Sequence, residues 1–142
     1  MALQTNELYS ETTRGALPRV QPAEGPGAVM TRAFASGSGT LAVGCPVYIN
    51  ASGYVAKLAP AGTAHATAPA AEIVCGIVWP AAVTLNGSGE VLGTVMLKGS
   101  AHLEDVGTAH GTSITDANFL LALRNPKTRL AGITIEGLTL AQ

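Results

Sequence analysis

The sequence predicts a mainly β domain, folded as a compact antiparallel sandwich or barrel, with one short helix and an extended N-terminal arm. Runs rich in β-branched and aromatic residues predict the strands, as in AVMTRAFA (28–35), LAVGCPVYI (41–49) and EIVCGIVW (72–79). Turn sequences between such runs, ASG at 51–53 and NGSG at 86–89, predict hairpins. Seventeen glycines and a 4% share of aromatic residues indicate that small apolar side chains do most of the packing.

The first 27 residues differ from the rest of the chain. They are mostly polar and contain Pro18, Pro22 and Pro26, a composition with little apolar periodicity for a helix or a paired central strand. We therefore expect two parts, an extended arm over 1–27 and a β-rich domain over 28–142; a disordered tail is the alternative for the first part. The arm carries apolar residues that could be buried on another surface: Leu8, Tyr9, Leu17 and Val20.

The second half of the chain contains the one helix that the sequence predicts. Thr115 or Asp116 could cap ANFLLALRN, and Pro126 ends the helix soon afterwards. The stretch APAGTAHATAPAA at 59–71 is a loop of small residues, and TRLAGITIEGLTL at 128–140 alternates well enough for a closing pair of strands. A chain of this length is sufficient for one core.

Candidate chemistry is concentrated in GTVMLKGSAHLEDV at 93–106. On a strand, His102 and Glu104 share a face and Asp105 points the other way. A metal site needs a third ligand, and the nearby His110, on the loop GTAHGTS, has a spacing that matches no zinc signature. The serines lie in turn compositions without an orienting base. The sequence therefore predicts no catalytic residue, no metal and no cofactor, and the trio is interpreted as the polar end of a strand.

Charge is low for a soluble domain. Charged residues make up 12% of the chain and the net charge is −1, so we expect partners to cover much of the surface. Without clustered Lys and Arg, direct nucleic-acid binding is not expected. No apolar run predicts a membrane span and no signal peptide is expected, which indicates synthesis in the cytoplasm. Cys45 and Cys75, both in apolar settings, are interpreted as free thiols in preference to a disulfide.

The order of these features resembles the head decoration (cement) proteins of tailed bacteriophages, in particular the lambdoid ones. In those proteins a strand that ends in an aromatic residue and then Glu-Asp-Val precedes the helical region, and HLEDV at 102–106 stands in a comparable place, with His102 instead of the aromatic residue. VYINASGYVAKLAPAG at 47–62 is similar to the hairpins of small cement proteins. The resemblance covers about residues 25–140 in feature order and implies a β-tulip-like fold.

The resemblance also implies a role and partners. It implies a virion protein on the capsid exterior, present as a homotrimer at threefold or quasi-threefold sites, which stabilises the head against internal DNA pressure. Its arm would dock on the major capsid protein after the shell has expanded. We expect Leu8, Tyr9, Leu17, Pro18 and Val20 to bind the capsid and Trp79 to be a packing anchor.

Other function classes stay open at this stage. A phage tail or baseplate component would share the β content and the low charge. A small metal-dependent hydrolase would require His102, Glu104 and His110 to converge. A carbohydrate-binding module would require several exposed aromatic residues on one sheet face, and the chain has only six aromatic residues of the Phe, Trp and Tyr types.

Overall fold

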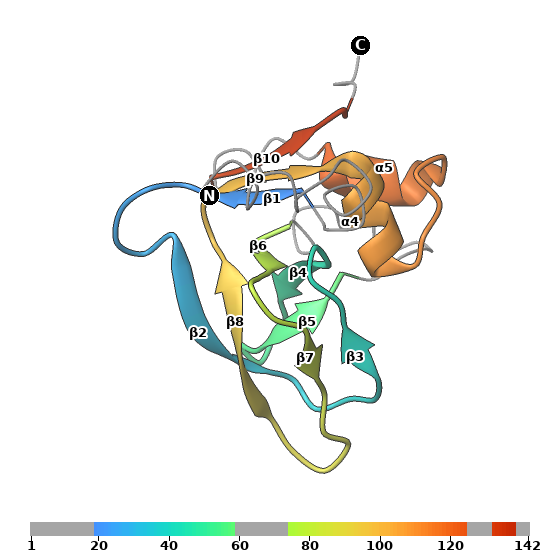
Figure 1. The fold of residues 1–142 in the computed structure, drawn as a ribbon. Coiled ribbons are helices and arrows are strands. Elements are labelled where there is room, and N and C mark those ends of the chain that lie inside the picture. The colour runs from blue at the N-terminus through green and yellow to red at the C-terminus, as the bar shows by residue number, and fades with distance from the viewer. Residues whose placement is uncertain (1–18, 59–73, 125–131, 139–142) are drawn as a thin grey trace, which may run out of the picture.

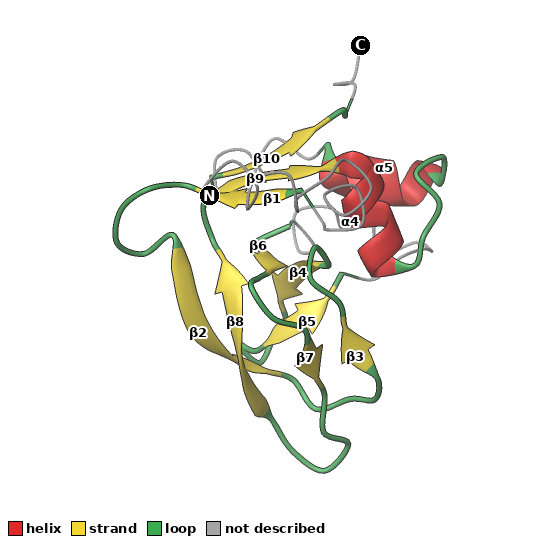
Figure 2. Ribbon diagram, viewed as in Figure 1, coloured by secondary structure: helices red, strands yellow, loops and turns green. Residues whose placement is uncertain are grey.

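A closed β-barrel dominates the structure, and the helices lie together at one side of it (Figures 1 and 2). The structure is a computed structural model that describes residues 19–58, 74–124 and 132–138. The strands in these ranges are β1 (Val20–Pro22), β2 (Val29–Phe34), β3 (Thr40–Leu41), β4 (Pro46–Ile49), β5 (Val55–Lys57), β6 (Gly76–Val78), β7 (Val83–Thr84), β8 (Val91–Met96), β9 (Gly99–His102) and β10 (Ile133–Glu136). The helices are α4 (Leu103–His110) and α5 (Ala117–Leu123). The predicted mainly β class is confirmed, and the described ranges contain two helices where the sequence predicted one.

The barrel closes in the strand order β2-β5-β4-β6-β8. Its longest ladder joins β2 to β8 in antiparallel register, from Val29 opposite Met96 to Phe34 opposite Val91. The seam between β2 and β5 is parallel and consists of one register pair, Phe34 with Val55. Strand β2 is therefore joined to β8 along its whole length, whereas its contact with β5 consists of a single register pair.

Two smaller sheets flank the barrel. One has the order β1-β9-β10, in which β1 is antiparallel to β9 and β10 is parallel to it. The other pairs β3 with β7. The expectation of a closing strand pair in 128–140 is met by one strand, β10, within the described residues. Its partner is β9, more than thirty residues earlier in the chain.

Local side-chain hydrogen bonds fix the two predicted hairpin turns. Asn50 Oδ1 accepts from the amides of Ser52 and Tyr54, both at 3.0 Å, which shapes the turn between β4 and β5. In the same way, Asn86 Oδ1 accepts from the amide of Ser88 at 2.9 Å. Asparagine side chains mimic a backbone turn through such bonds. The predicted hairpin at 51–53 is confirmed, since β4 pairs with β5. At 86–89 the turn is present and is closed by a bridge between Asn86 and Gly89, but the strands on either side of it, β7 and β8, pair with other strands and not with each other.

Strand alternation divides the buried side chains into two clusters. On β6 and β8, Val78 and Val95 point into the barrel, where they join Phe34 and Val47. Their neighbours in sequence, such as Ile77, point outward. The outward residues form a second cluster with the β1-β9-β10 sheet and the helices, which includes Leu58, Val74, Met96, Val106, Phe119, Leu123 and Ile133. One set of strands thus supports a core on each of its faces.

The predicted helix is confirmed and its cap is Asp116. The Asp116 carboxylate accepts from the amide of Phe119 at 2.9 Å, as an N-cap residue does. The second helix, α4, begins directly after β9 at Leu103, where the sequence predicted only the end of a strand. His102 is the last residue of β9 and also the N-cap of α4.

The described part of the expected arm belongs to the domain. Val20–Pro22 pair with Gly99–Ala101 as β1, and Val20 packs against the outer cluster. The domain therefore begins by residue 19, earlier than the expected boundary at 28. Three prolines obscured this short strand in the sequence. Pro22 can occupy it because β1 lies at a sheet edge, where a missing N–H costs no ladder bond.

Candidate functional site

The residues that drew attention in the sequence meet at the junction of β9 and α4. His102 Nδ1 accepts from the amide of Glu104 at 3.3 Å, so the imidazole caps the helix. Glu104 and Asp105 occupy the first turn, where carboxylates interact favourably with the positive end of the helix dipole. The expectation that His102 and Glu104 share a strand face is wrong, because the strand ends at His102. The trio is the N-terminal cap of a helix.

Asp105 also fastens the start of β1 to this helix. Its Oδ2 accepts from the backbone amide of Arg19 at 2.9 Å and from Arg19 Nε at 2.7 Å. In return, the amide of His102 donates to the carbonyl of Arg19 at 3.1 Å. Burial raises the pKa of the Asp105 carboxyl, but the hydrogen bonds and charge of Arg19 outweigh it and leave the pKa below its usual value. The ionised carboxylate thus holds the N-terminal strand in place.

The lowered pKa of Asp105 predicts a pH dependence of stability. A carboxyl with a lower pKa in the folded state stabilises the fold above its unfolded pKa, about 3.9, and loses that contribution as the pH falls through the folded value. We expect Asp105→Asn to be less stable than the parent chain near pH 7, with the difference vanishing at the acid end. Urea unfolding at a series of pH values measures this. Glu104→Gln is the matched control, and a constant difference for Asp105→Asn would contradict the prediction.

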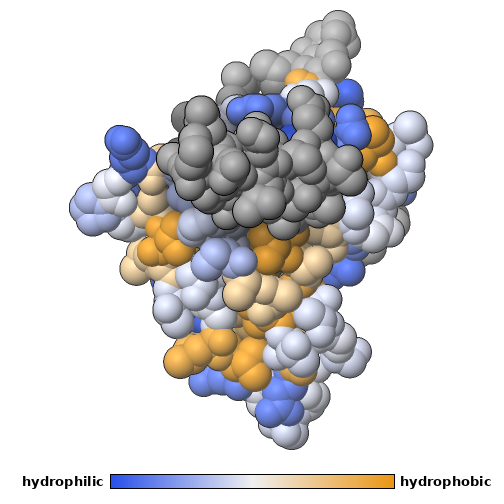
Figure 3. Space-filling view, in the orientation of Figure 1, coloured by the Kyte–Doolittle hydropathy of each residue, from blue (hydrophilic) through white to orange (hydrophobic). Residues whose placement is uncertain are grey.

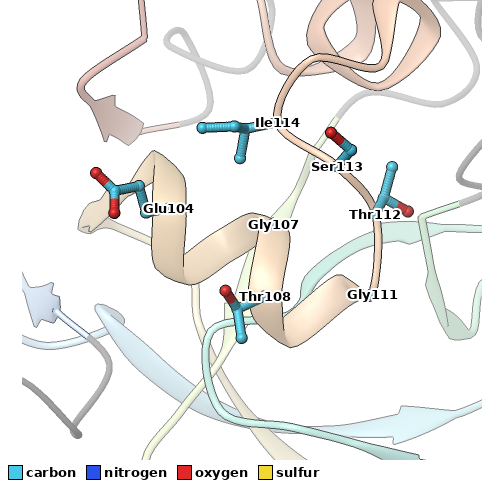
Figure 4. A pocket seen from close by; sticks show the side chains of 7 residues that line it. All are labelled: Glu104, Gly107, Thr108, Gly111, Thr112, Ser113 and Ile114. Carbon is cyan, nitrogen blue, oxygen red and sulfur yellow. The ribbon is translucent and has the colours of Figure 1, made fainter.

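An open groove runs along α4 and the segment that follows it (Figure 4). Its volume is about 460 Å³, and it is lined by Glu104, Gly107, Thr108, Gly111, Thr112, Ser113 and Ile114. One carboxylate and three hydroxyls could hydrogen-bond a polar ligand. For one of these hydroxyls to act as a catalytic nucleophile, it would need an accessible base beside it and a free donor to stabilise an oxyanion. Here the amides of Gly111 and Thr112 both donate to the carbonyl of Gly107, so they are already used.

His110 lies at the last turn of α4 and not on a loop as expected. Its side chain is 2% exposed. Nε2 donates to the carbonyl of Leu58, so in the neutral ring Nδ1 accepts from the Thr112 hydroxyl, at 2.8 Å. The ring also packs on Phe119, with centroids 4.8 Å apart. These contacts connect the C-terminal end of α4 to the end of β5.

The three residues of the metal hypothesis do not converge. His102 precedes α4 and His110 ends it, which separates them by about 12 Å along the helix axis at 1.5 Å per residue. Within the described ranges, no group of three His, Cys, Asp or Glu side chains could hold a metal ion. The two cysteines, Cys45 and Cys75, are not joined in a disulfide. Burial raises the pKa of the Cys45 thiol to about 12, which keeps it protonated.

A second cavity, which the sequence did not indicate, opens into the barrel. Its volume is about 250 Å³. The walls are apolar, and one cationic side chain, that of Arg32, stands at the edge; the main lining residues are Arg32, Val47, Ile49, Val55, Val95 and Leu97. The only signal in the sequence is Arg32 itself. In VMTRAF it lies two residues from both Met30 and Phe34, so on a strand it shares their face. Arginine is unexpected on the inward face of a strand.

The residues that the sequence predicted to dock on a capsid lie mostly outside the described ranges. This applies to Leu8, Tyr9, Leu17 and Pro18. Val20 is described, and its side chain packs within this domain. Trp79 is half-buried beside the outer cluster, and its amide donates to the carbonyl of Thr94 at 3.4 Å. This position fits a packing anchor.

Comparisons with protein-family models, curated proteins and solved structures found no match for this chain. Among the described residues, neither helix has the length and apolar character that a membrane crossing requires.

Proposed function

We propose that the chain is a structural virion protein that binds the outer surface of the expanded capsid of a tailed bacteriophage. It binds as a homotrimer at threefold or quasi-threefold positions and stabilises the head against internal DNA pressure. The junction at HLEDV carries the proposal. In the proteins that the chain resembles, a strand, Glu-Asp-Val and a helical region follow one another; here β9 ends at His102 and α4 begins at Leu103.

The apolar surface of the barrel also supports a partner-bound role. Leu92 on β8 is 74% exposed, and Met30 on β2 and Ile49 on β4 are exposed as well. On the face of the molecule that Figure 3 shows, apolar surface appears in several separate places. In a chain with 12% charged residues, such surface favours association with other subunits. Several separate contacts also suit a protein that joins neighbouring capsid subunits, because linked weak contacts release slowly.

The N-terminal segment supplies the proposed capsid contact. Residues 1–18 precede β1, which is an edge strand of its sheet. An extended segment can add a strand to a sheet of the capsid protein, in which main-chain hydrogen bonds give affinity and alternate side chains set the register. Leu8, Tyr9, Leu17 and Pro18 are the proposed contacts. Val20 has its partners in the domain, so the contact ends before it.

Deleting residues 1–18 is expected to abolish capsid binding and leave the domain folded. The deletion stops before Arg19, because Arg19 bonds to Asp105 and Val20 begins β1. Co-sedimentation with mature, DNA-filled particles and with unexpanded shells measures binding, and circular dichroism checks the fold. We expect the full chain to bind only the mature particles, and Tyr9→Ala to weaken binding at least about tenfold, as for an anchor residue at an interface.

Glu7→Ala is the matched control for Tyr9→Ala, since it changes a neighbouring residue that is polar. Undiminished binding of the deletion variant would remove the arm from the mechanism. Failure of the full chain to bind mature particles would contradict the proposed function. Immunogold electron microscopy that places the protein on tails would favour the tail or baseplate role, and a monomer in native mass spectrometry, free and on particles, would contradict the homotrimer.

A further inference from the structure

The cavity of the barrel is lined by residues from all five strands of its wall, in which the β2–β5 seam has the fewest register pairs. β2 and β5 share one register pair, Phe34 with Val55, and Phe34 fills the barrel at that level. Beyond this pair the lining comes from Arg32 on β2, from Val47 and Ile49 on β4, and from Val95 and Leu97 on and just after β8. The result is an apolar chamber of about 250 Å³ that is open to the surface. Its size suits one leucine- or phenylalanine-sized side chain.

Arg32 stands at the edge of this chamber without a carboxylate partner in the described part of the chain. Two residues from Phe34 on the same strand, it shares the inward face, and Gly93 lies opposite it in the β2–β8 ladder. Glycine supplies no side chain to pair with it. Arg32 Nη2 contacts Met30 Sδ at 4.0 Å, and the ion pair found among the described residues joins Arg19 to Asp105 instead.

This arrangement has a defined chemical complement. A guanidinium presents paired N–H donors that match a carboxylate, and an apolar wall nearby favours an apolar group attached to that acid. The apolar surface also continues past the chamber, since Met30 lies outside the lining and is 41% exposed. A free small acid held in the chamber would leave the Met30 side chain in water. A polypeptide lying across the opening would cover it.

We propose that the open barrel is a docking pocket for a partner protein, which inserts one apolar side chain and pairs an adjacent carboxylate with Arg32. The inference that the pocket accepts an apolar side chain and a carboxylate rests only on the geometry of the pocket. The identity of the partner, the major capsid protein, rests on the proposed function. The pocket would then be a second contact with the capsid, separate from the N-terminal arm.

The first experiment tests the pocket with small probes on the full-length chain. N-acetyl-leucine, which carries an apolar side chain and a carboxylate, is compared with its neutral amide by NMR titration. We expect the acid to bind about tenfold more tightly than the amide, the effect of one charge-assisted hydrogen-bonded pair, with shifts at Val47, Val55 and Val95. Arg32→Gln should remove the preference for the acid. Arg124→Gln, which removes the same charge at the end of α5, should keep it.

The second experiment measures co-sedimentation of the same variants with mature particles. We expect Arg32→Gln to weaken binding about tenfold and Arg124→Gln to leave it unchanged, with equal melting temperatures. If the parent chain and Arg32→Gln sediment equally, the docking pocket is refuted and the capsid role stands. If the parent chain does not sediment with the particles, the capsid role fails, and the NMR titration still shows whether the pocket binds an acid through Arg32.

Octanoate serves as a further probe in the NMR titration. If octanoate binds through Arg32 while N-acetyl-leucine does not, the pocket is a site for free acids and the docking proposal is overturned.

Discussion

Replacing Gly99 with alanine is expected to detach β1 from β9 and to destabilise the domain by about 3 kcal/mol, the sum of backbone strain and overpacking. Gly99 begins β9 with φ of +146°, a conformation that side chains with a Cβ rarely adopt. An added Cβ would collide with the carbonyl oxygen of Gln21 and lie 2.8 Å from Pro22 Cα. Both atoms belong to the backbone of β1, so neither can move without breaking the Pro22–Gly99 pairing.

Gly111→Ala separates the two parts of this effect. Gly111 also has a positive φ, +82°, but a Cβ there would meet nothing within 4 Å. It should cost about 1 kcal/mol, the strain of the left-handed conformation alone. Urea unfolding measures both free energies, and hydrogen exchange at the amide of His102, which donates to Arg19, reports the detachment of β1. Equal losses for the two variants would show that the clash with β1 does not matter.

The elements that the sequence predicts correctly depend on short-range chemistry. Asn50 and Asn86 shape their turns through bonds to amides two residues later, and Asp116 caps α5 through an amide three residues later. Such signals are complete within a few residues, so they can be read from the chain itself. Both turns, the β4–β5 hairpin and helix α5 are therefore predicted correctly.

Helix α4 was missed because its local signals are weak. Gly107 and the β-branched Val106 and Thr108 lower the helix propensity of LEDVGTAH. The structure explains the glycine: a Cβ there would lie 2.6 Å from Ile114 Cγ2, so the chain after the helix could not pack back against it. The packing of the following chain against Gly107 offsets the low helix propensity, and no pattern within the segment indicates that packing.

The candidate sites depend on contacts between distant residues. His110 looked like a loop residue, but its ring bonds to the carbonyl of Leu58, 52 residues earlier. Arg32 gains significance because it lines the chamber together with Val55 and Val95, which lie far from it in the sequence. Register and closure of a barrel are set by such long-range pairing, which short strands specify weakly. The sequence shows which residue types are present, but it does not show which distant residues each of them contacts in the fold.

Phe119→Ala is expected to cause the other large loss of stability, about 3–5 kcal/mol, as for a large core residue reduced to alanine. Its side chain is 0% exposed and belongs to the outer cluster, where α5 meets α4 and the sheet. The ring also packs on His110, which holds Leu58 through Nε2. The substitution therefore opens a cavity and removes the support of a buried polar group whose own partner lies at the end of β5.

Leu121→Ala is the matched control, because Leu121 lies on the same helix but is 44% exposed, and it should cost well under half as much. Thermal and urea unfolding give both values. A double-mutant cycle with His110→Ala isolates the ring contact, for which we expect a coupling of about 1 kcal/mol. If Phe119→Ala costs no more than Leu121→Ala, the outer cluster does not hold the helices to the barrel. If the cycle shows no coupling, the imidazole is held by its hydrogen bonds to Leu58 and Thr112, and the aromatic contact adds nothing.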